Sequence, residues 1–274
     1  MIDIKNKSIL LVNDDGIYST GLLELKKHIE NRLPNAEVTV VAPTNQQSGV
    51  GRAISLFEPL RITETKLLDG SIGYAVSGTP TDCVILGIYK ILNKIPDIVV
   101  SGINIGENLG TEITTSGTLG AAFEGAHHGA KALACSLQVL DDHLKFKEGE
   151  SSYSRFTIPA KITSKVVEQY LKNGFNCDVI NLNFPENVKE DTDIKITKLA
   201  KKMYSAHIDE RTDPRNRSYY WISGDPIIDI DPETDVYTIR TEGKISLTPL
   251  TLDTTIKHLD EFKVKYSDNI KHYK

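Results

Sequence analysis

The sequence is poor in cysteine. Its 274 residues include three cysteines, Cys83, Cys135 and Cys177, an odd number that lies widely spaced in apolar surroundings. This spacing argues against a disulfide framework and matches no zinc-binding or paired nucleophile motif. We therefore expect buried thiols in a protein of the reducing cytoplasm.

Long apolar runs and an excess of positive charge are also absent. No segment reaches the ~20 apolar residues of a membrane span. The stretch MIDIKNKSILLVN is too short in its apolar part for a signal peptide. The net charge is −5, which argues against a nucleic-acid polymer or an anionic membrane as partner. A small anionic ligand would need local help from a metal ion or from backbone N–H groups.

The composition is that of a globular protein with a substantial core. Hydrophobic residues make up 39% of the chain and charged residues 25%. A chain of 274 residues can form one large α/β domain, or a main domain with a smaller appendage.

Strand and helix patterns alternate over the first 140 residues. Short apolar runs typical of buried strands occur at 8–13, 36–43, 96–104 and around 132–139. Helical patterns lie at 20–33, at 78–92 and from near Gly117 onward. This alternation predicts an α/β fold with a mostly parallel sheet and helices on both faces.

The pattern changes after residue 140. A helical pattern strengthens toward the end of 156–174, and 177–185 predicts one more core strand. From 190 to about 250, β-rich runs that include VYTIRTEG alternate with turn residues. They predict hairpins on a small β appendage, with some return to the main sheet.

We expect one domain overall, made of two parts. Residues 1–140 form the N-terminal core, and residues 141–274 add a further core strand and the appendage. A polar connector over 141–155 joins the two parts, and we expect the polar tail at 262–274 to be loosely held.

Two adjacent carboxylates, Asp14 and Asp15, follow the first predicted strand in LLVNDDGIYSTG. The residues NDDG alone are typical of a simple turn. In an open parallel sheet, however, ligands bind outside the carboxyl ends of the strands. A hard divalent cation at that edge would relieve the repulsion between the two carboxylates, because it prefers carboxylate oxygens.

Two further oxygen ligands are available if the predicted strands are parallel, because their loops then converge. Ser48 follows the strand at 36–43, and Asn104 ends the strand at 96–104. With the two aspartates they leave room for water and a substrate oxygen around a Mg2+ or Mn2+ ion. Ordinary loop and turn roles explain Ser48 and Asn104 equally well from their spacing alone.

The segment GINIGENLGTEITTSGTLGAA, residues 102–122, is rich in glycine and hydroxyl groups. It leads into a helix near Gly117, and a helix start with free N–H groups favours an anion. The segment matches neither a Walker loop nor a dinucleotide fingerprint, which weighs against an ATPase or an NAD enzyme. The alternative is a glycine-rich helix packed on its sheet, which leaves the preceding polar run unexplained.

Two other features are interpreted as structural. His127 and His128 lack an H-E-x-x-H pattern. Trp221, with Tyr219 and Tyr220, could stack on a base, but such residues are more typical of a hairpin core.

Taken together, the motifs resemble the SurE family of stationary-phase survival nucleotidases. The resemblance runs from about residue 8 to residue 255. Its blocks, in order, are ILLVNDDGI, VVAPTNQQSGVGRAIS, VSGTPTDCV, PDIVVSGINIGENLG with SGTLGAAFEGA, YYWISG and GKISLTPLTLDTT. Several blocks in the family's order are far more specific than one glycine pattern.

The resemblance implies a Rossmann-like fold whose C-terminal β-hairpin extension helps to form homodimers or homotetramers. The metal ligands that it implies are Asp14, Asp15, Ser48 and Asn104. The phosphate-binding residues that it implies are Asn108, Ser116, Gly117 and Thr118. Thr115 departs from a tyrosine of the family pattern, and Tyr18 and Ser19 stand where small residues are common. These departures leave the substrate preference open.

The function that we expect is hydrolysis of nucleoside 5′-monophosphates, with 3′-monophosphates as further candidates. One divalent ion, Mg2+ or Mn2+ (with Ca2+ as a substitute in crystals), would lower the pKa of a coordinated water. That water attacks phosphorus, with Asp14, Asp15 and Asn104 as catalytic residues.

Two alternatives stay open. Asp14 or Asp15 could form an aspartyl-phosphate, although the adjacent pair does not match the D-x-D spacing of that class. The chain could also be a regulatory module that binds a nucleotide or phosphate without turnover.

Overall fold

The computed structural model describes residues 6–140, 153–227 and 231–255 of the chain. Most of the expected polar connector and all of the expected loose tail lie outside the described residues.

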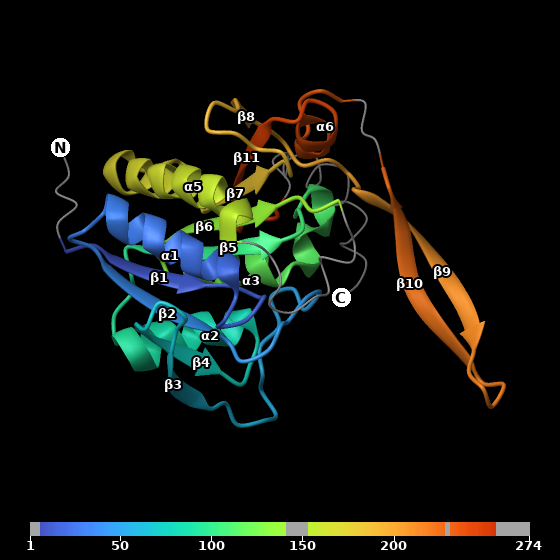
Figure 1. Cartoon of the computed structure of the whole chain (residues 1–274), viewed down its shortest axis with the longest axis horizontal. Coiled ribbons are helices and arrows are strands. Elements are labelled where there is room, and N and C mark those ends of the chain that lie inside the picture. The colour runs from blue at the N-terminus through green and yellow to red at the C-terminus, as the bar shows by residue number, and fades with distance from the viewer. Residues whose placement is uncertain (1–5, 141–152, 228–230, 256–274) are drawn as a thin grey trace, which may run out of the picture.

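A nine-stranded sheet forms the body of the protein, and a two-stranded sheet forms a separate hairpin (Figure 1). The strands of the large sheet are β1 (Ser8–Val12), β2 (Glu37–Pro43), β3 (Ile62–Lys66), β4 (Ile72–Val76), β5 (Ile98–Ile105), β6 (Lys131–Leu137), β7 (Val179–Phe184), β8 (Ile194–Ile196) and β11 (Ile245–Leu250). The hairpin pairs β9 (Tyr204–Thr212) with β10 (Ser218–Pro226).

The strand order in the large sheet is β3-β4-β2-β1-β5-β6-β7-β11-β8. The six strands from β4 to β7 in this order are parallel, whereas β3 and β11 are antiparallel to their neighbours β4 and β7. From β1 the chain builds outward through β2 and β4, and then returns to the other side of β1 with β5. The strand order therefore reverses between β1 and β5, where ligands bind in open α/β sheets. The predicted mostly parallel sheet is confirmed.

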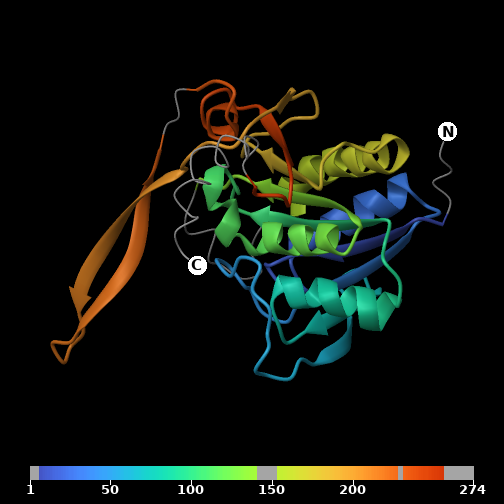
Figure 2. The ribbon, with the colours of Figure 1, turned by 180° about the vertical axis from the view of Figure 1, so that it is seen from behind.

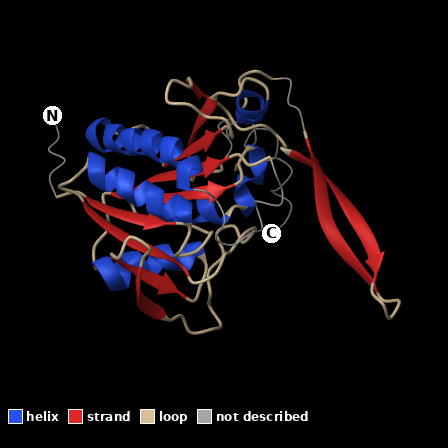
Figure 3. Cartoon of the chain, in the orientation of Figure 1, coloured by secondary structure: helices blue, strands red, loops and turns tan. Residues whose placement is uncertain are grey.

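Helices cover both faces of this sheet (Figures 2 and 3). The helices are α1 (Thr20–Arg32), α2 (Pro80–Leu86), α3 (Gly117–His127), α5 (Tyr153–Asn173) and α6 (Asp235–Arg240). A π-helical turn, Gly87–Leu92, continues α2, and a 3-10 segment, Gly110–Thr115, precedes α3. The helices α1 and α5 pack on one face, and α2 and α3 pack on the other.

Burial on both faces explains the apolar run of β1. Ile9 and Leu11 belong to the core cluster under α1 and α5. Leu10 and Val12 belong to the cluster under α2 and α3. A strand covered on both sides needs no polar alternation, so SILLV is apolar throughout.

The start of α2 follows its sequence signals. Thr79 caps the helix by accepting a hydrogen bond from the Asp82 N–H, and Asp82 bonds back to the Thr79 N–H. Pro80 stands in the first turn, where a missing N–H costs nothing. The predicted helix start is confirmed.

The sequence analysis placed no strand between 44 and 78, where the structure has β3 and β4. Both strands are short, and exposed side chains interrupt their apolar pattern. The antiparallel pairing of β3 with β4, and the parallel pairing of β4 with β2, stabilise them at the edge of the sheet.

The prediction that the β-rich run VYTIRTEG is part of a hairpin is wrong. Most of the run lies in helix α6, Asp235–Arg240. Thr234 caps this helix by accepting a 3.3 Å hydrogen bond from the Tyr237 N–H. Val236 and Ile239, three residues apart, are both buried. The cap and this helical spacing outweigh the strand propensity of the run.

Helix α5 is longer than predicted and contains Pro159 in its interior. Phe156 and Val167, on either side of the proline, are fully buried in the core that α5 shares with α1. This burial outweighs the backbone hydrogen bond that a proline removes.

The hairpin of β9 and β10 projects from the body as a long ribbon (Figure 1). The expected hairpin extension is therefore present, but the prediction that its aromatic residues form a hairpin core is wrong. Tyr220 and Trp221 are 61% and 59% exposed. A two-stranded ribbon has no second layer that could bury them.

Cysteine exposure agrees largely with expectation. Cys83 and Cys135 are buried, Cys177 is half-buried, and all three are free thiols. In the part of the chain that the structure describes, no helix is long and apolar enough to cross a bilayer.

Candidate functional site

The NDDG turn after β1 is held by its own first and last residues. The Asn13 side chain accepts a 3.2 Å hydrogen bond from the Gly16 N–H and donates a 2.9 Å bond to the Gly16 carbonyl. Gly16 has a φ of +98°, which only glycine adopts readily. The turn fixes the backbone of Asp14 and Asp15 at the edge of the sheet.

Asp14 is 4% exposed and faces the start of α3. Its Oδ1 accepts a 2.7 Å hydrogen bond from the Thr118 hydroxyl. A Cβ atom at Gly117 would lie 3.0 Å from the Asp14 Cβ and 3.1 Å from its Oδ2. The absence of a side chain at Gly117 therefore lets the helix start approach the carboxylate.

Asp15 is half-buried and receives donors from two other loops. Its Oδ2 accepts a 3.2 Å hydrogen bond from the Ile105 N–H at the end of β5. Its Oδ1 accepts a 3.4 Å bond from the Gln46 amide, which also donates to the Ser48 Oγ at 3.1 Å. Gln46 therefore joins Asp15 to Ser48, and the loops after β1, β2 and β5 converge as the sequence predicted.

Asn104 is the second-to-last residue of β5, directly before Ile105. Its Nδ2 donates a 2.7 Å hydrogen bond to the Gly106 carbonyl. The bond uses the amide nitrogen and leaves the amide oxygen, the atom that binds a hard cation.

Burial makes two negative charges costly at this site. It raises the pKa of Asp14 from 3.8 to about 6, against the opposing effect of the Thr118 hydroxyl. Burial, and then the charge of Asp14, raise the pKa of Asp15 well above its ordinary value. Positive charge between the two carboxylates would relieve this cost.

The donor atoms fit a hard divalent cation. Two carboxylates, the Ser48 hydroxyl and the Asn104 amide oxygen form an all-oxygen set of the kind that Mg2+ and Mn2+ prefer. Within residues 6–140, 153–227 and 231–255, no three His, Cys, Asp or Glu side chains cluster as a metal site. A cation at this edge would therefore depend on the neutral oxygens as well as on Asp14 and Asp15.

The start of α3 is the candidate site for an anion. Ser116 caps the helix, and its Oγ accepts a 3.2 Å hydrogen bond from the Leu119 N–H. Gly117 and Thr118 follow in the first turn, against Asp14. The dipole of a helix start, and N–H groups there that have no helical carbonyl as partner, favour an anion.

Asn108 lies farther along the loop after β5, and its hydrogen bonds go to β6 and β7. Its N–H donates to the Asn183 Oδ1 at 2.9 Å, and its Nδ2 donates to the Ser136 Oγ at 2.8 Å. Asn181 and Asn183 both donate to its carbonyl, at 2.9 and 3.0 Å. The structure thus fixes the backbone of Asn108, whose predicted contact with phosphate stays a prediction.

The sequence analysis missed three residues that support the site. These are Gln46, Asn181 and Asn183. A signal for the two asparagines was present, because VINLNF places amides two residues apart on one side of a strand that is fully buried. Buried amides need hydrogen-bond partners, and a pair on one face of a strand indicates that they bind the backbone of a loop packed on that face. Nothing in the sequence distinguishes Gln46 from its neighbours.

Comparisons with known proteins identify relatives of this chain. The family model described as survival protein SurE matches residues 9–206. A Methanococcus maripaludis (strain C5) protein named 5′-nucleotidase SurE is 68% identical over 259 residues, which cover 94% of this chain and 97% of that protein. A Methanocaldococcus jannaschii protein of the same name is 65% identical over 258 residues, which cover 94% and 97%.

A solved structure is also similar over almost the whole chain. The crystal structure of the SurE protein from Aquifex aeolicus superposes with a TM-score of 0.74 at 33% identity. The match covers 96% of this chain and 98% of that one. Since the family model covers most of the chain and the curated relatives match it almost end to end, this chain belongs to the SurE family.

Proposed function

We propose that this chain is a divalent-metal-dependent nucleotidase that hydrolyses nucleoside 5′-monophosphates to nucleoside and phosphate. Relatives that are 65% and 68% identical carry the name 5′-nucleotidase. Nucleoside 3′-monophosphates are further candidate substrates.

One observation carries the proposal: Asp14 lies against the start of α3, with Asp15 next to it in the chain, where the strand order reverses. A helix start favours an anion, but two carboxylates beside it repel a phosphate. A cation between them removes this conflict, so the arrangement fits a metal and a phosphate bound together.

Each predicted site residue has a role in this proposal. Asp14, Asp15, Ser48 and Asn104 would hold one Mg2+ or Mn2+ ion, and Asn108, Ser116, Gly117 and Thr118 would hold the phosphate. When bound, such an ion supplies positive charge to a phosphoryl group and makes water more acidic.

The side chains and backbone N–H groups of the chain supply proton transfer, charge stabilisation and orientation. A carboxylate oxygen of Asp14 or Asp15 accepts the proton of the attacking water. N–H groups at the start of α3 stabilise the equatorial oxygens as charge shifts in the transition state. Thr118 orients Asp14, and the Ile105 N–H orients Asp15, before substrate arrives.

A direct experiment measures inorganic phosphate release from AMP and GMP with Mn2+, and repeats it with EDTA. We expect release that depends on Mn2+ and that Asp14→Asn abolishes. Equally low release in both conditions would instead favour a binding module without turnover. A phospho-enzyme trapped in acid would favour an aspartyl-phosphate mechanism.

We also propose that the hairpin joins copies of this chain into a homodimer or homotetramer. The hairpin exposes large apolar side chains on both of its faces: Ile208, Tyr219, Tyr220, Trp221 and Ile222. A patch of this kind on a ribbon without a second layer is typical of a protein interface.

We further propose a cytoplasmic location for the chain. The free thiols support a reducing environment of that kind.

A further inference from the structure

The loop that carries Asn108, residues 106–110 (the Asn108 loop), is pinned at both ends. Its first residue, Gly106, donates a 2.8 Å hydrogen bond from its N–H to the Leu137 carbonyl. Its last residue, Gly110, has a φ of +58° and donates from its N–H to the Asp235 Oδ2 at 2.8 Å. Asp235 is the first residue of α6 and is fully buried.

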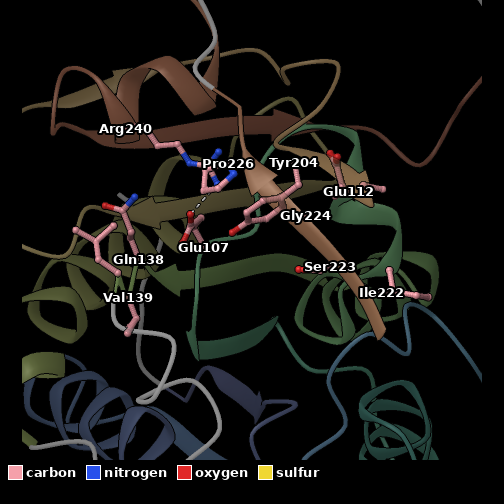
Figure 4. A pocket seen from close by; sticks show the side chains of 12 residues that line it. Glu107, Glu112, Gln138, Val139, Tyr204, Ile222, Ser223, Gly224, Pro226 and Arg240 are labelled. Carbon is pink, nitrogen blue, oxygen red and sulfur yellow. Dashed lines mark hydrogen bonds and ion pairs between the residues drawn. The ribbon is translucent and has the colours of Figure 1, made fainter. Parts of the chain in front are cut away.

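The other end of α6 holds the middle of the same loop. The Arg240 Nη2 donates a 3.0 Å hydrogen bond to the Glu107 Oε1. The two side chains are only 10% and 5% exposed, and Figure 4 shows them facing each other. Removing one member of a buried ion pair leaves the other charge uncompensated. Glu107 is therefore fixed by Arg240, and Asn108 is the next residue.

Arg240 also holds the base of the hairpin. Its Nη1 donates to the Met203 carbonyl at 2.6 Å and to the Ile227 carbonyl at 3.0 Å. These residues directly precede β9 and follow β10. The guanidinium lies 4.9 Å from the centre of the Tyr204 ring. One side chain thus ties the hairpin to the Asn108 loop.

Arg240 lines a cavity of about 830 Å3 between the hairpin base and the loop (Figure 4). A cation in a cavity next to a phosphate site could itself bind an anion. The Glu107 carboxylate neutralises this one, however, and two backbone carbonyls accept hydrogen bonds from its Nη1. The contacts of Arg240 are therefore those of a residue that stabilises the protein structure, and not those of an anion-binding residue.

We propose that Arg240 is a positioning residue for the Asn108 loop. Through Arg240, helix α6 fixes the positions of both the loop and the base of the hairpin. The proposal rests on the proposed function only for its effect on catalysis. The claim about the loop itself can be measured without turnover.

The first experiment measures amide hydrogen exchange over residues 106–110 in the full chain. We expect Arg240→Ala to speed exchange there by about tenfold or more, because a local opening becomes easier. Arg240→Lys keeps the charge but cannot reach all three partners. Its exchange rate over residues 106–110 should therefore lie between those of the wild type and Arg240→Ala. Unchanged exchange in both variants overturns the proposal.

Lys195→Ala is the matched control. Lys195 donates to the Pro232 carbonyl at 2.8 Å and to both carboxylate oxygens of Glu242 at 3.0 Å. It thus also bridges a carboxylate and a carbonyl close to α6, but its partners lie outside the Asn108 loop. Its loss should leave exchange over 106–110 unchanged.

The second experiment measures the kinetics of phosphate release from AMP. Arg240→Ala should raise KM for the nucleotide about 10- to 100-fold, the effect of a misplaced binding group. The Mn2+ concentration for half-maximal rate should not change. In an Asn108→Ala background, Arg240→Ala should change KM less than about twofold, because both act on one contact.

The outcomes separate the two proposals. A lower kcat with unchanged KM, or an additive double variant, overturns the positioning role. A wild-type chain that releases no phosphate overturns the proposed function alone, and hydrogen exchange then decides the role of Arg240 by itself.

Discussion

The Thr118 hydroxyl donates a 2.7 Å hydrogen bond to the Asp14 carboxylate and so joins the start of α3 to the loop after β1. The same bond opposes the effect of burial on the pKa of Asp14. A residue at the start of α3 thus influences the pKa of a candidate metal ligand.

Thr118→Val tests this relationship. The variant keeps the shape of the side chain and removes the hydroxyl, so the pKa of Asp14 should rise further. We expect the acid side of the pH–rate profile to move to higher pH, and kcat/KM at pH 7 to fall about tenfold or more. Thr118→Ser should restore both, and an unshifted profile would show that the Thr118 hydroxyl does not influence the pKa of Asp14.

The stability of the metal-free chain should depend on pH in a defined direction. The pKa of Asp14 is raised from 3.8 to about 6 in the folded state, so the folded state binds this proton more tightly than the unfolded state. The resulting stabilisation is present below about pH 4 and is lost as the pH rises through about 6. Unfolding in urea between pH 4 and 7 measures it, and Asp14→Asn should flatten the decline.

A divalent ion should compensate for this loss. Because the ion competes with the protons on Asp14 and Asp15, Mn2+ should raise the unfolding midpoint at pH 7 and have little effect at pH 4.5. Thermal unfolding with Mn2+ and with EDTA measures the difference. Equal shifts at both pH values, or in Asp14→Asn, would place the bound ion elsewhere.

Asn183→Leu should disturb the phosphate side of the site and leave the metal side intact. The substitution removes the acceptor of the Asn108 N–H and one of the two donors to its carbonyl. A buried group left unpaired costs about 1–3 kcal/mol. We expect a lower free energy of unfolding and a higher KM, with unchanged half-saturation by Mn2+. A weakened Mn2+ response would instead link Asn183 to the metal.

Ile222→Asp should weaken self-association without unfolding the chain. Ile222 is 84% exposed on β10, so a charge there is harmless to an isolated protomer but costly inside an apolar interface. Light scattering coupled to gel filtration should show a smaller species than wild type. Arg217→Ala, at the exposed turn of the hairpin, serves as the control. An unchanged mass would exclude this face as the interface.

The sequence predicted most of the parallel core well, because β1, β2, β5, β6 and β7 are short apolar runs and the helices α1, α2 and α3 carry their own signals. SILLV predicts a strand buried on both faces, and Pro80 with Asp82 predicts the start of α2. The convergence of the loops after β1, β2 and β5 followed from the parallel strands, whereas the choice of Ser48 and Asn104 within those loops also depended on the resemblance to the family.

The edges and the appendage were harder to predict. The strands β3 and β4 are stabilised by pairing with distant segments, which a local pattern does not show. VYTIRTEG has strand propensity, and its helical form depends on the Thr234 cap and on burial of Val236 and Ile239. The exposure of Trp221 depends on the absence of a second layer over the ribbon.

The sequence by itself determined the alternation of strands and helices and the residue types at the carboxyl ends of the strands, because both depend on neighbours along the chain. Only the tertiary structure decided how those residues are held. Thr118 on Asp14, Gln46 between Asp15 and Ser48, and Arg240 on Glu107 join segments far apart in the chain. Such contacts depend on how helices, loops and hairpin pack on one sheet, and packing is a property of the folded chain as a whole.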